Sequence, residues 1–179
     1  MGAQPVVGYL TSATRLSSGA GYRAREVGAL RAEVELALRI GRAVGPGDAL
    51  SRAREAVDAV AVALELVDVR PPRGEVEPIL EANVFHRAFA IGPPCAVTSA
   101  VQRRAWLAVN GEVRGVSPVG EDYAETVRAA AAVLAAVGEA LEPRDWLIAG
   151  SLVHVAVGPG DRISVEIEGL GRRETAIVS

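Results

Sequence analysis

The sequence predicts an α+β domain that is rich in strands and has two main helices. Several segments alternate apolar with polar residues, the dipeptide Asn110-Gly111 lies between two such runs, and only two segments place apolar residues at helical spacing. Strands and helices do not alternate regularly along the chain, which favours α+β over a parallel α/β fold. With 179 residues, half of them hydrophobic, the chain can bury the core of one domain over residues 1–179.

The first third of the chain predicts two strands and a turn. Residues 5–16 contain a short apolar piece, VVGYL, that predicts a strand, and a polar, glycine-rich loop follows it. Residues 29–40 predict a second strand, because apolar and other side chains alternate there with a period of two. The sequence GPGD at residues 45–48 predicts a turn.

A helix is predicted from Ser51, which can cap its first turn, to about Leu64. Its apolar stripe at helical spacing consists of Ala53, Val57, Val60, Ala61 and Leu64. The helix leads into the segment ALELVDV, and the sequence Pro-Pro-Arg-Gly at residues 71–74 then breaks the chain. An apolar segment resumes over residues 84–91 before a second break at Gly-Pro-Pro.

The second half of the chain predicts a hairpin, a helix and further strands. Asn110-Gly111 lies between two alternating runs and predicts a tight hairpin turn. A helix is predicted from about Asp122 to near Leu141, before Pro143, and its many alanines indicate close packing against a sheet. The remaining residues, 145–178, predict several short strands joined by glycine-containing turns.

The composition excludes several classes of function. The net charge of −3 and the absence of a basic stripe interleaved with aromatics argue against nucleic acid as a partner. No leader pattern and no run of about eighteen apolar residues is present, and the single Cys95 excludes an intrachain disulfide. The chain is therefore expected to be a cytoplasmic protein without membrane contact. All 19 basic residues are arginine, so no mechanism can use a lysine.

Common catalytic motifs are also missing. The sequence has no P-loop, no dinucleotide-binding glycine pattern after a strand, no H-E-x-x-H and no G-x-S-x-G. The two histidines, His86 and His154, are far apart in the chain and define no zinc site.

The chemically informative feature is a set of three carboxylates. In a strand, Glu33 and Glu35 share one face, and Glu65 follows about thirty residues later. Like charges on one face need water, internal cations or a shared metal ion, and hard divalent cations prefer carboxylate oxygens. A solvated strand face and a metal site both remain open at this point. Arginine or histidine side chains pointing at the carboxylates would argue against the metal.

The ordered segments of the chain resemble a known family. The segments are RAEVELALRIGRAV, ALELVDVR, EANVFHRAFAIG, LAVNGEVRGV, LEPRDWLIAGSL and VGPGDRISVEIEGLG. In this order, from about Val6 to Val178, they are similar to the 2-keto-4-pentenoate hydratase and 4-oxalocrotonate decarboxylase family of the fumarylacetoacetate hydrolase superfamily. The resemblance implies a mixed β-sheet roll or sandwich of the type found in the C-terminal domain of that superfamily.

The resemblance also implies a metal site. In the family, the glutamates of an E-x-E strand and of an A-L-E segment bind magnesium or manganese, which chelates the α-keto acid end of the substrate. The corresponding ligands in this sequence are Glu33, Glu35 and Glu65. Such chelation stabilises the enolate that forms when water adds to an alkene or carbon dioxide leaves.

Several departures from the family pattern affect the expected chemistry. The family's N-terminal helical segment is absent, the family lysine has no counterpart in VVGYLTS, and the loop that would form a lid is shortened. Asn83 matches a family asparagine, while the bulky Phe85, His86 and Arg87 replace small residues. His86 and Arg87 either bring new acid, base or anion-binding chemistry to the pocket or face solvent and fill space. Asp68 and Ser151 are further candidates for the rim.

Three hypotheses follow. The first is a metal-dependent lyase that acts on a keto acid or keto-enol compound, with His86 as a proton shuttle. The second is a repurposed cyclase or isomerase of a larger, polyketide-like biosynthetic intermediate, with little or no metal use. The third is a non-catalytic partner subunit. A homodimer is expected in each case, with a small-molecule substrate in the first two.

Overall fold

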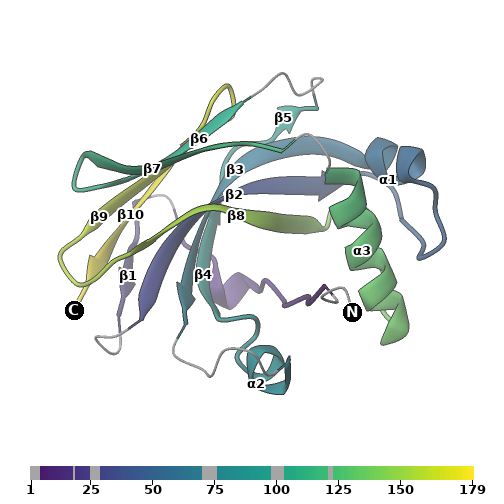
Figure 1. Cartoon of the computed structure of the whole chain (residues 1–179), viewed down its shortest axis with the longest axis horizontal. Helices are drawn as coiled ribbons and strands as arrows, with labels where there is room; N and C mark the ends of the chain where they lie inside the picture. Colours follow the sequence, from purple (N-terminus) through teal and green to yellow (C-terminus); the bar gives the residue numbers. More distant parts are fainter. Residues whose placement is uncertain (1–4, 18, 25–28, 70–75, 98–102, 121–122) are drawn as a thin grey trace.

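The computed structural model describes residues 5–17, 19–24, 29–69, 76–97, 103–120 and 123–179. Within these residues the chain forms two β-sheets, three α-helices and one 3-10 turn, the α+β architecture that the sequence predicts (Figure 1).

The first sheet has the strand order β4-β3-β2-β8. Its two long central strands, β2 (Leu30–Ile40) and β3 (Val57–Asp68), are antiparallel to each other. On the outer side of β3 lies β4 (His86–Ile91), and on the outer side of β2 lies β8 (Trp146–Ala156), both antiparallel to their neighbours. The short β5 (Cys95–Ala96) pairs with the start of β3.

The second sheet has the order β1-β10-β9-β6-β7. Its strands are β1 (Gly21–Arg23), β10 (Gly171–Val178), β9 (Arg162–Ile167), β6 (Arg104–Val109) and β7 (Glu112–Pro118). The pairing is parallel between β1 and β10 and antiparallel elsewhere.

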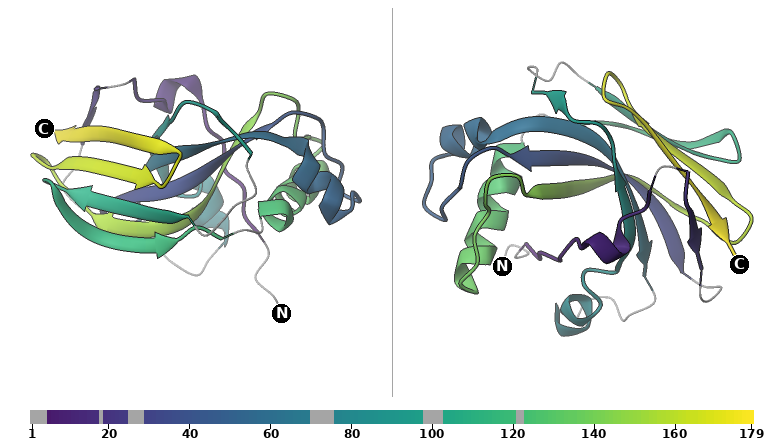
Figure 2. Two further views of the ribbon diagram at one scale, coloured as in Figure 1. Left: turned by 90° about the horizontal axis from the view of Figure 1, so that it is seen from above. Right: turned by 180° about the vertical axis from the view of Figure 1, so that it is seen from behind.

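The main core lies between the two sheets. Apolar side chains of β2 and β3 pack there against those of β6, β9 and β10, and the second sheet lies across part of one face of the first (Figure 2). The fully buried large side chains are Leu38, Ile40, Leu64, Leu66, Leu107, Ile163, Ile167, Leu170 and Ile177, with Val34, Val62 and Val127. The opposite face of the first sheet is therefore left for other elements.

The helices lie around the edges of the first sheet. Helices α1 (Leu50–Ala56) and α3 (Tyr123–Ala136) pack against each other at one end, and α2 (Val76–Glu81) precedes β4. The N-terminal segment, with its 3-10 turn η1 (Ser12–Thr14), runs between β4 and α3 (Figures 1 and 2). Of the helices described, none has the length and apolar character that crossing a membrane requires.

Two predicted elements are confirmed with almost the expected bounds. The carboxylate strand is β2, one residue shorter than predicted. The hairpin joins β6 to β7, and Asn110 and Gly111 have φ values of 54° and 83°, as a two-residue turn with both central residues left-handed requires.

The predicted helix from Ser51 to Leu64 is wrong for most of its length. Helix α1 ends at Ala56, and the chain continues directly as β3. Because β3 is buried on both faces, it is apolar at almost every position, and a continuous apolar run matches helical spacing as well as it matches a strand. The β-branched Val57, Val60 and Val62 favour the strand.

The predicted strand in residues 6–10 is also wrong, because this segment joins neither sheet. The backbone of Tyr9 pairs with a side chain: its N–H donates to Asn83 Oδ1 (2.7 Å), and its carbonyl accepts from Asn83 Nδ2 (2.9 Å). One asparagine amide thus replaces the neighbouring strand that the sequence pattern implied.

Helix α3 ends five residues before the predicted end at Leu141. Gly138, with φ 80°, stops it, because the Glu139 N–H bonds to the Leu134 carbonyl and the Gly138 N–H to that of Ala135. The helix packs mainly on α1 rather than on a sheet. Its predicted start at Asp122, and the predicted break at residues 71–74, lie outside the described residues.

Candidate metal-binding site

Three glutamates lie together on the face of the first sheet that points away from the second sheet. Alternation along β2 sends Val34 into the main core and Glu33 and Glu35 to the opposite face. On β3, Glu65 is the direct cross-strand partner of Glu33. One oxygen from each of these three side chains, the carboxylate trio, lies within 4.8 Å of the others.

The trio is largely removed from water. Only 5% of Glu35 and 9% of Glu65 is exposed, and Glu33 is half-buried. Burial raises the pKa of Glu35 well above its usual range, and the negative charges of Glu65 and Glu33 raise it further. Burial and the charge of Glu65 also raise the pKa of Glu33. Without a cation, Glu35 and Glu33 therefore keep their protons to a higher pH than ordinary glutamates do.

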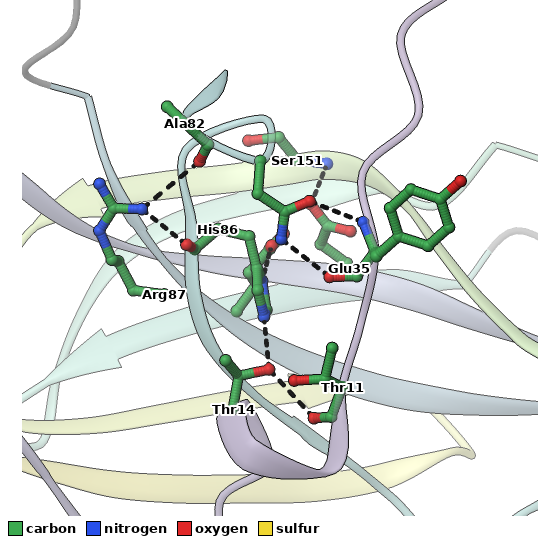
Figure 3. Close-up of polar contacts among 10 residues, drawn as sticks. Thr11, Thr14, Glu35, Ala82, His86, Arg87 and Ser151 are labelled. Carbon is green, nitrogen blue, oxygen red and sulfur yellow. Dashed lines mark hydrogen bonds and ion pairs between the residues drawn. The ribbon is translucent and has the colours of Figure 1, made fainter. Parts of the chain in front are cut away.

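A bulge in β8 places a backbone donor on this cluster. The register between β2 and β8 shifts between Val34 and Leu36, so residues 150–152 face Glu35 alone. The bulge gives Ser151 a φ of 51° and lets its N–H donate to Glu35 Oε1 at 3.1 Å (Figure 3). This hydrogen bond favours the ionised form of Glu35 and so lowers its pKa.

His86, the first residue of β4, holds Glu65 from the other side. Its Nδ1 lies 2.6 Å from Glu65 Oε1, and its Nε2 lies 2.9 Å from Thr14 Oγ1 in η1 (Figure 3). In a neutral ring whose Nδ1–H donates to the Glu65 carboxylate, Nε2 accepts from the Thr14 hydroxyl. When the ring carries a second proton, Nε2–H donates instead, and the hydroxyl turns to the Thr11 carbonyl at 3.1 Å.

His86 follows a strained turn. The three preceding residues, Asn83, Val84 and Phe85, have φ values of 52°, 54° and 67°. Left-handed backbone costs an ordinary L-residue about 1–2 kcal/mol, and three in succession, including a β-branched valine, are unusual. Strain of this kind persists where the surrounding structure requires it, and here it sets the direction from which His86 enters the sheet.

Asn83 lines the cavity, but the oxygen and the nitrogen of its side-chain amide both bond to the backbone of Tyr9. Its role in this structure is to hold the N-terminal segment against the turn. Gly8 permits the close approach, because a Cβ there would lie 2.8 Å from Asn83 Oδ1.

Arg87 and Asp68 lie outside the cavity next to the trio. The Arg87 guanidinium donates to the carbonyl of His86 at 2.8 Å and lies 3.9 Å from an Asp68 carboxylate oxygen. Figure 3 shows Arg87 on the far side of the turn from Glu35. Of the eight residues predicted for the site, the structure therefore gathers six: the trio with Asn83, His86 and Ser151.

The trio opens into a large cavity of about 1290 Å³. Its walls include the N-terminal segment at residues 5–12, the turn before β4, one side of α3, residues of the connection that follows α3, and the first half of β8, with further residues of β3 and β4. A cavity of this size exceeds what most small-molecule sites provide.

Four residues near the site were not identified from the sequence. They are Tyr9, Thr14, Trp146 and His154. His154 is the cross-strand neighbour of Glu33 on β8, and its charge lowers the pKa of Glu33. Its ring lies 3.3 Å from Ser151 Oγ. Only the register of β8 brings it there, and a sequence of alternating residues does not fix that register.

The trio fits a divalent cation. Carboxylate oxygens bind magnesium, manganese or calcium at about 2.0–2.6 Å, so ligand oxygens lie at most about 4–5 Å apart, as in the trio. Among the described residues, no arginine forms an ion pair with these three glutamates, and His86 engages one oxygen of Glu65 only. Burial, followed by the mutual repulsion of the carboxylates, raises the pKa values of Glu33 and Glu35, and a bound cation would offset both causes.

The sequence and the fold both match known proteins. The model of the family described as fumarylacetoacetate (FAA) hydrolase C-terminal matches residues 3–178. No curated protein matches the chain at a significant level.

Three solved structures illustrate the likeness of fold. The 4-oxalocrotonate decarboxylase from Pseudomonas putida G7, complexed with magnesium and adipate, superposes with a TM-score of 0.85 at 22% identity, over 96% of this chain and 69% of that chain. The fumarylpyruvate hydrolase from Pseudomonas aeruginosa, in complex with Mn²⁺ and pyruvate, gives 0.72 at 25% identity, over 92% and 73%. The 5-carboxymethyl-2-hydroxymuconate delta-isomerase from Mycobacterium smegmatis gives 0.72 at 21% identity, over 92% and 66%.

Proposed function

The chain belongs to the fumarylacetoacetate hydrolase C-terminal family, and from this membership we propose that it is a divalent-metal-dependent lyase. Its substrate is a small 2-oxo acid or keto-enol compound, which it hydrates, dehydrates or decarboxylates. The observation that carries the proposal is the carboxylate trio, which is buried, short of positive charge and open to a cavity. Neighbours of this fold bind magnesium, calcium or manganese.

Glu33, Glu35 and Glu65 would hold Mg²⁺ or Mn²⁺. A bound ion of this kind acts as a Lewis acid toward adjacent substrate oxygens and so stabilises the negative charge that the reaction develops there. The chain's own contribution is to fix the ligands: the Ser151 N–H orients Glu35, and His86 orients Glu65.

His86 is also the proposed proton carrier. Hydration and decarboxylation both require a proton at a substrate carbon, and an imidazole is well suited to deliver one near neutral pH. The ring lines the cavity beside the trio. Its Nε2 is hydrogen-bonded to the Thr14 hydroxyl, and either of the two groups can be the donor in that bond. Arg87 has no part in this proposal, because its guanidinium is bonded outside the cavity.

A second candidate is a cyclase or isomerase of a larger substrate. The observation that favours it is the volume of the cavity, about 1290 Å³, which is more than a short keto acid fills. That the protein works as a homodimer in the cytoplasm stays a prediction from the sequence.

Thermal unfolding with and without metal tests the metal site. Saturating Mg²⁺ or Mn²⁺ should raise the melting temperature by about 5–10 °C at a hundredfold excess over Kd, and a chelator should reverse the rise. Glu35→Gln should lose the shift, while Glu166→Gln, at an exposed position in β9, should keep it. A wild-type protein whose melting temperature responds to no divalent ion would refute the metal-dependent lyase.

The products then identify the reaction. With an unsaturated 2-oxo acid, a hydratase removes the ultraviolet absorbance of the conjugated system without releasing carbon dioxide. A decarboxylase releases carbon dioxide from the same acid. A metal shift without turnover of any such acid would support the non-catalytic subunit instead.

A further inference from the structure

The face of the first sheet that carries the trio is acidic at the trio and becomes apolar at the next residue on that face, along both β2 and β3. Two residues after Glu35 on β2 comes Ala37, and two residues before Glu65 on β3 comes Ala63. These alanines, with Ala61, are fully buried and form a second apolar cluster, separate from the main core. Because successive same-face residues of a strand lie about 7 Å apart, this cluster begins directly beside the carboxylates.

Three larger side chains cover the alanines. Ile148 of β8 is the cross-strand partner of Ala37, Ile91 of β4 is the partner of Ala63, and Trp146 lies two residues from Ile148 on the same strand. All three are half-buried, and all three line the cavity that contains the trio. Their exposed surfaces therefore form an apolar floor, defined here as Ile91, Trp146 and Ile148.

Helix α3 provides the wall that faces this end of the cavity. Its cavity-lining residues are Glu125 and Thr126 in the first turn and Ala129, Ala130 and Leu134 beyond it, so the wall is apolar from Ala129 onward. The charged residues that line the cavity in this part of the chain are Glu125, Glu139, Arg144 and Asp145, and Glu125 forms an ion pair with Arg128 at 2.7 Å.

We propose that this apolar end binds an uncharged hydrophobic group of the substrate, such as an aromatic ring or a branched hydrocarbon. The substrate is then an amphiphile: a 2-oxo acid head at the trio and an apolar tail on the floor. The identity of the head rests on the proposed function, while the tail rests on the floor and wall alone. A second carboxylate on the tail is disfavoured, because the apolar side chains of the floor and of α3 named above carry no charge that could pair with it.

Calorimetry with three ligands that share one head tests the tail. The ligands are 2-oxobutanoate, 2-oxo-4-phenylbutanoate and 2-oxoadipate, each titrated into the full chain with Mg²⁺ present. Burial of the phenyl group should make 2-oxo-4-phenylbutanoate bind about 10- to 100-fold more tightly than 2-oxobutanoate. Equal affinities, or tightest binding of 2-oxoadipate, would overturn the proposal.

Trp146 reports where the tail binds. The variant Trp106→Phe removes the tryptophan of β6, which lies outside the cavity, and leaves Trp146 as the one tryptophan. The phenyl ligand should change its emission, and 2-oxobutanoate should change it less. An emission that no ligand alters would place the tail elsewhere and contradict the proposal.

A polar substitution on the floor gives a matched comparison. Ile148→Asn should remove most of the preference for the phenyl ligand, while Val113→Asn, 55% exposed on β7, should preserve it. The wild-type ligand series and the Trp146 emission decide the proposal even if Ile148→Asn does not fold. If a second copy of the chain covers the floor instead, Ile148→Asn should change the sedimentation coefficient, and the wild type should not distinguish the ligands.

The same titrations separate this proposal from the proposed function. Repeating them with a chelator in place of Mg²⁺ tests the head. If the phenyl ligand binds equally well without metal and still alters Trp146, the apolar end stands and the metal-dependent lyase fails. If metal binding is intact and the three ligands bind alike, the lyase stands and the apolar tail fails.

Discussion

Glu35 is the residue whose chemistry depends most on its position in the fold. It is 5% exposed, lies beside two other carboxylates and receives one backbone hydrogen bond, from Ser151. Burial comes first among the causes that raise its pKa, ahead of the two negative charges. The folded state without metal therefore binds protons that the unfolded chain, where glutamates have ordinary pKa values, does not.

This difference predicts how stability varies with pH. Without divalent ions, the free energy of unfolding should fall as pH rises above about 4.3, the ordinary glutamate value, and through the raised pKa values of Glu35 and Glu33. Melting curves in a chelating buffer from about pH 4 to 8 measure the slope. Glu35→Gln, which carries no charge to bury, should flatten it, and Glu166→Gln should leave it unchanged. A wild-type stability that increases steadily over this interval would contradict the assignment.

At the residue scale, the sequence predicted much of the candidate site. Alternation alone put Glu33 and Glu35 on one face, and the family resemblance added Glu65, which the structure pairs with Glu33. The placement of Arg87 could not be read from the sequence, because β4 begins with a register irregularity beside it. Likewise, no sequence pattern shows that the side-chain amide of Asn83 would form hydrogen bonds with the backbone of another segment.

At the scale of elements, the left-handed turn before β4 is the least ordinary piece of backbone in the site. Val84 is its central residue, and a β-branched side chain is poorly suited to a φ of 54°. Its amide still bonds to the Ile79 carbonyl at 2.8 Å, so the turn continues the end of α2. The strain is thus carried by side-chain sterics and not by a missing hydrogen bond.

Replacing Val84 with glycine should relieve that strain. We expect Val84→Gly to raise the free energy of unfolding by about 1 kcal/mol, since glycine adopts positive φ without a Cβ clash. Val116→Gly, at an exposed position on β7, should lower it by about as much, because glycine weakens a strand. Urea unfolding of both variants makes the comparison. If both lose stability equally, the turn stores no strain.

Sequence patterns predicted elements well where they carried a specific turn signal. The Asn110-Gly111 hairpin is correct, and Gly138 marks the end of α3 although the prediction passed over it. The prediction failed for β3 because residues 57–67 are apolar at every position except Asp58 and Glu65, and periodicity carries little information in such a run. β3 can be apolar over most of its 12 residues because it is a central strand that is covered on both faces.

At the scale of the whole molecule, the two sheets approach closely where β7 crosses β8. Gly115 lies on β7, and a Cβ there would overlap the side chain of Val153 on β8. The two sheets are therefore held at a separation that only a glycine allows at this point. The same strand, β8, carries Ser151 and two of the three residues of the apolar floor, Trp146 and Ile148.

A methyl group at this crossing should push the sheets apart. We expect Gly115→Ala to lower the free energy of unfolding by about 1–3 kcal/mol, the usual cost of overpacking. Gly120→Ala, where a Cβ would meet nothing within 4 Å, should cost much less. Thermal unfolding of the two variants is the measurement. A Gly115→Ala protein as stable as the wild type would show that the sheets can separate freely.

The fold class and the family followed from the order of segments along the whole chain; the structure confirms the fold class, and the match to the family model confirms the superfamily. The arrangement of the two sheets did not follow, because strands that pair in the second sheet come from both ends of the chain, as β1 and β10 do. Contacts over such separations leave no local pattern in a sequence.

The bond between Asn83 and Tyr9 has a consequence for how this site could change. One wall of the cavity is a segment that belongs to neither sheet and is fastened to the turn by a single amide. Apart from Val7, which packs against the main core, residues 5–12 could therefore be exchanged for others of different shape or polarity without disturbing the strand register that aligns the trio. A designer who grafts loops here, keeping Gly8 and Asn83 as the attachment, could vary the ligand that is accepted while Glu33, Glu35 and Glu65 stay in place.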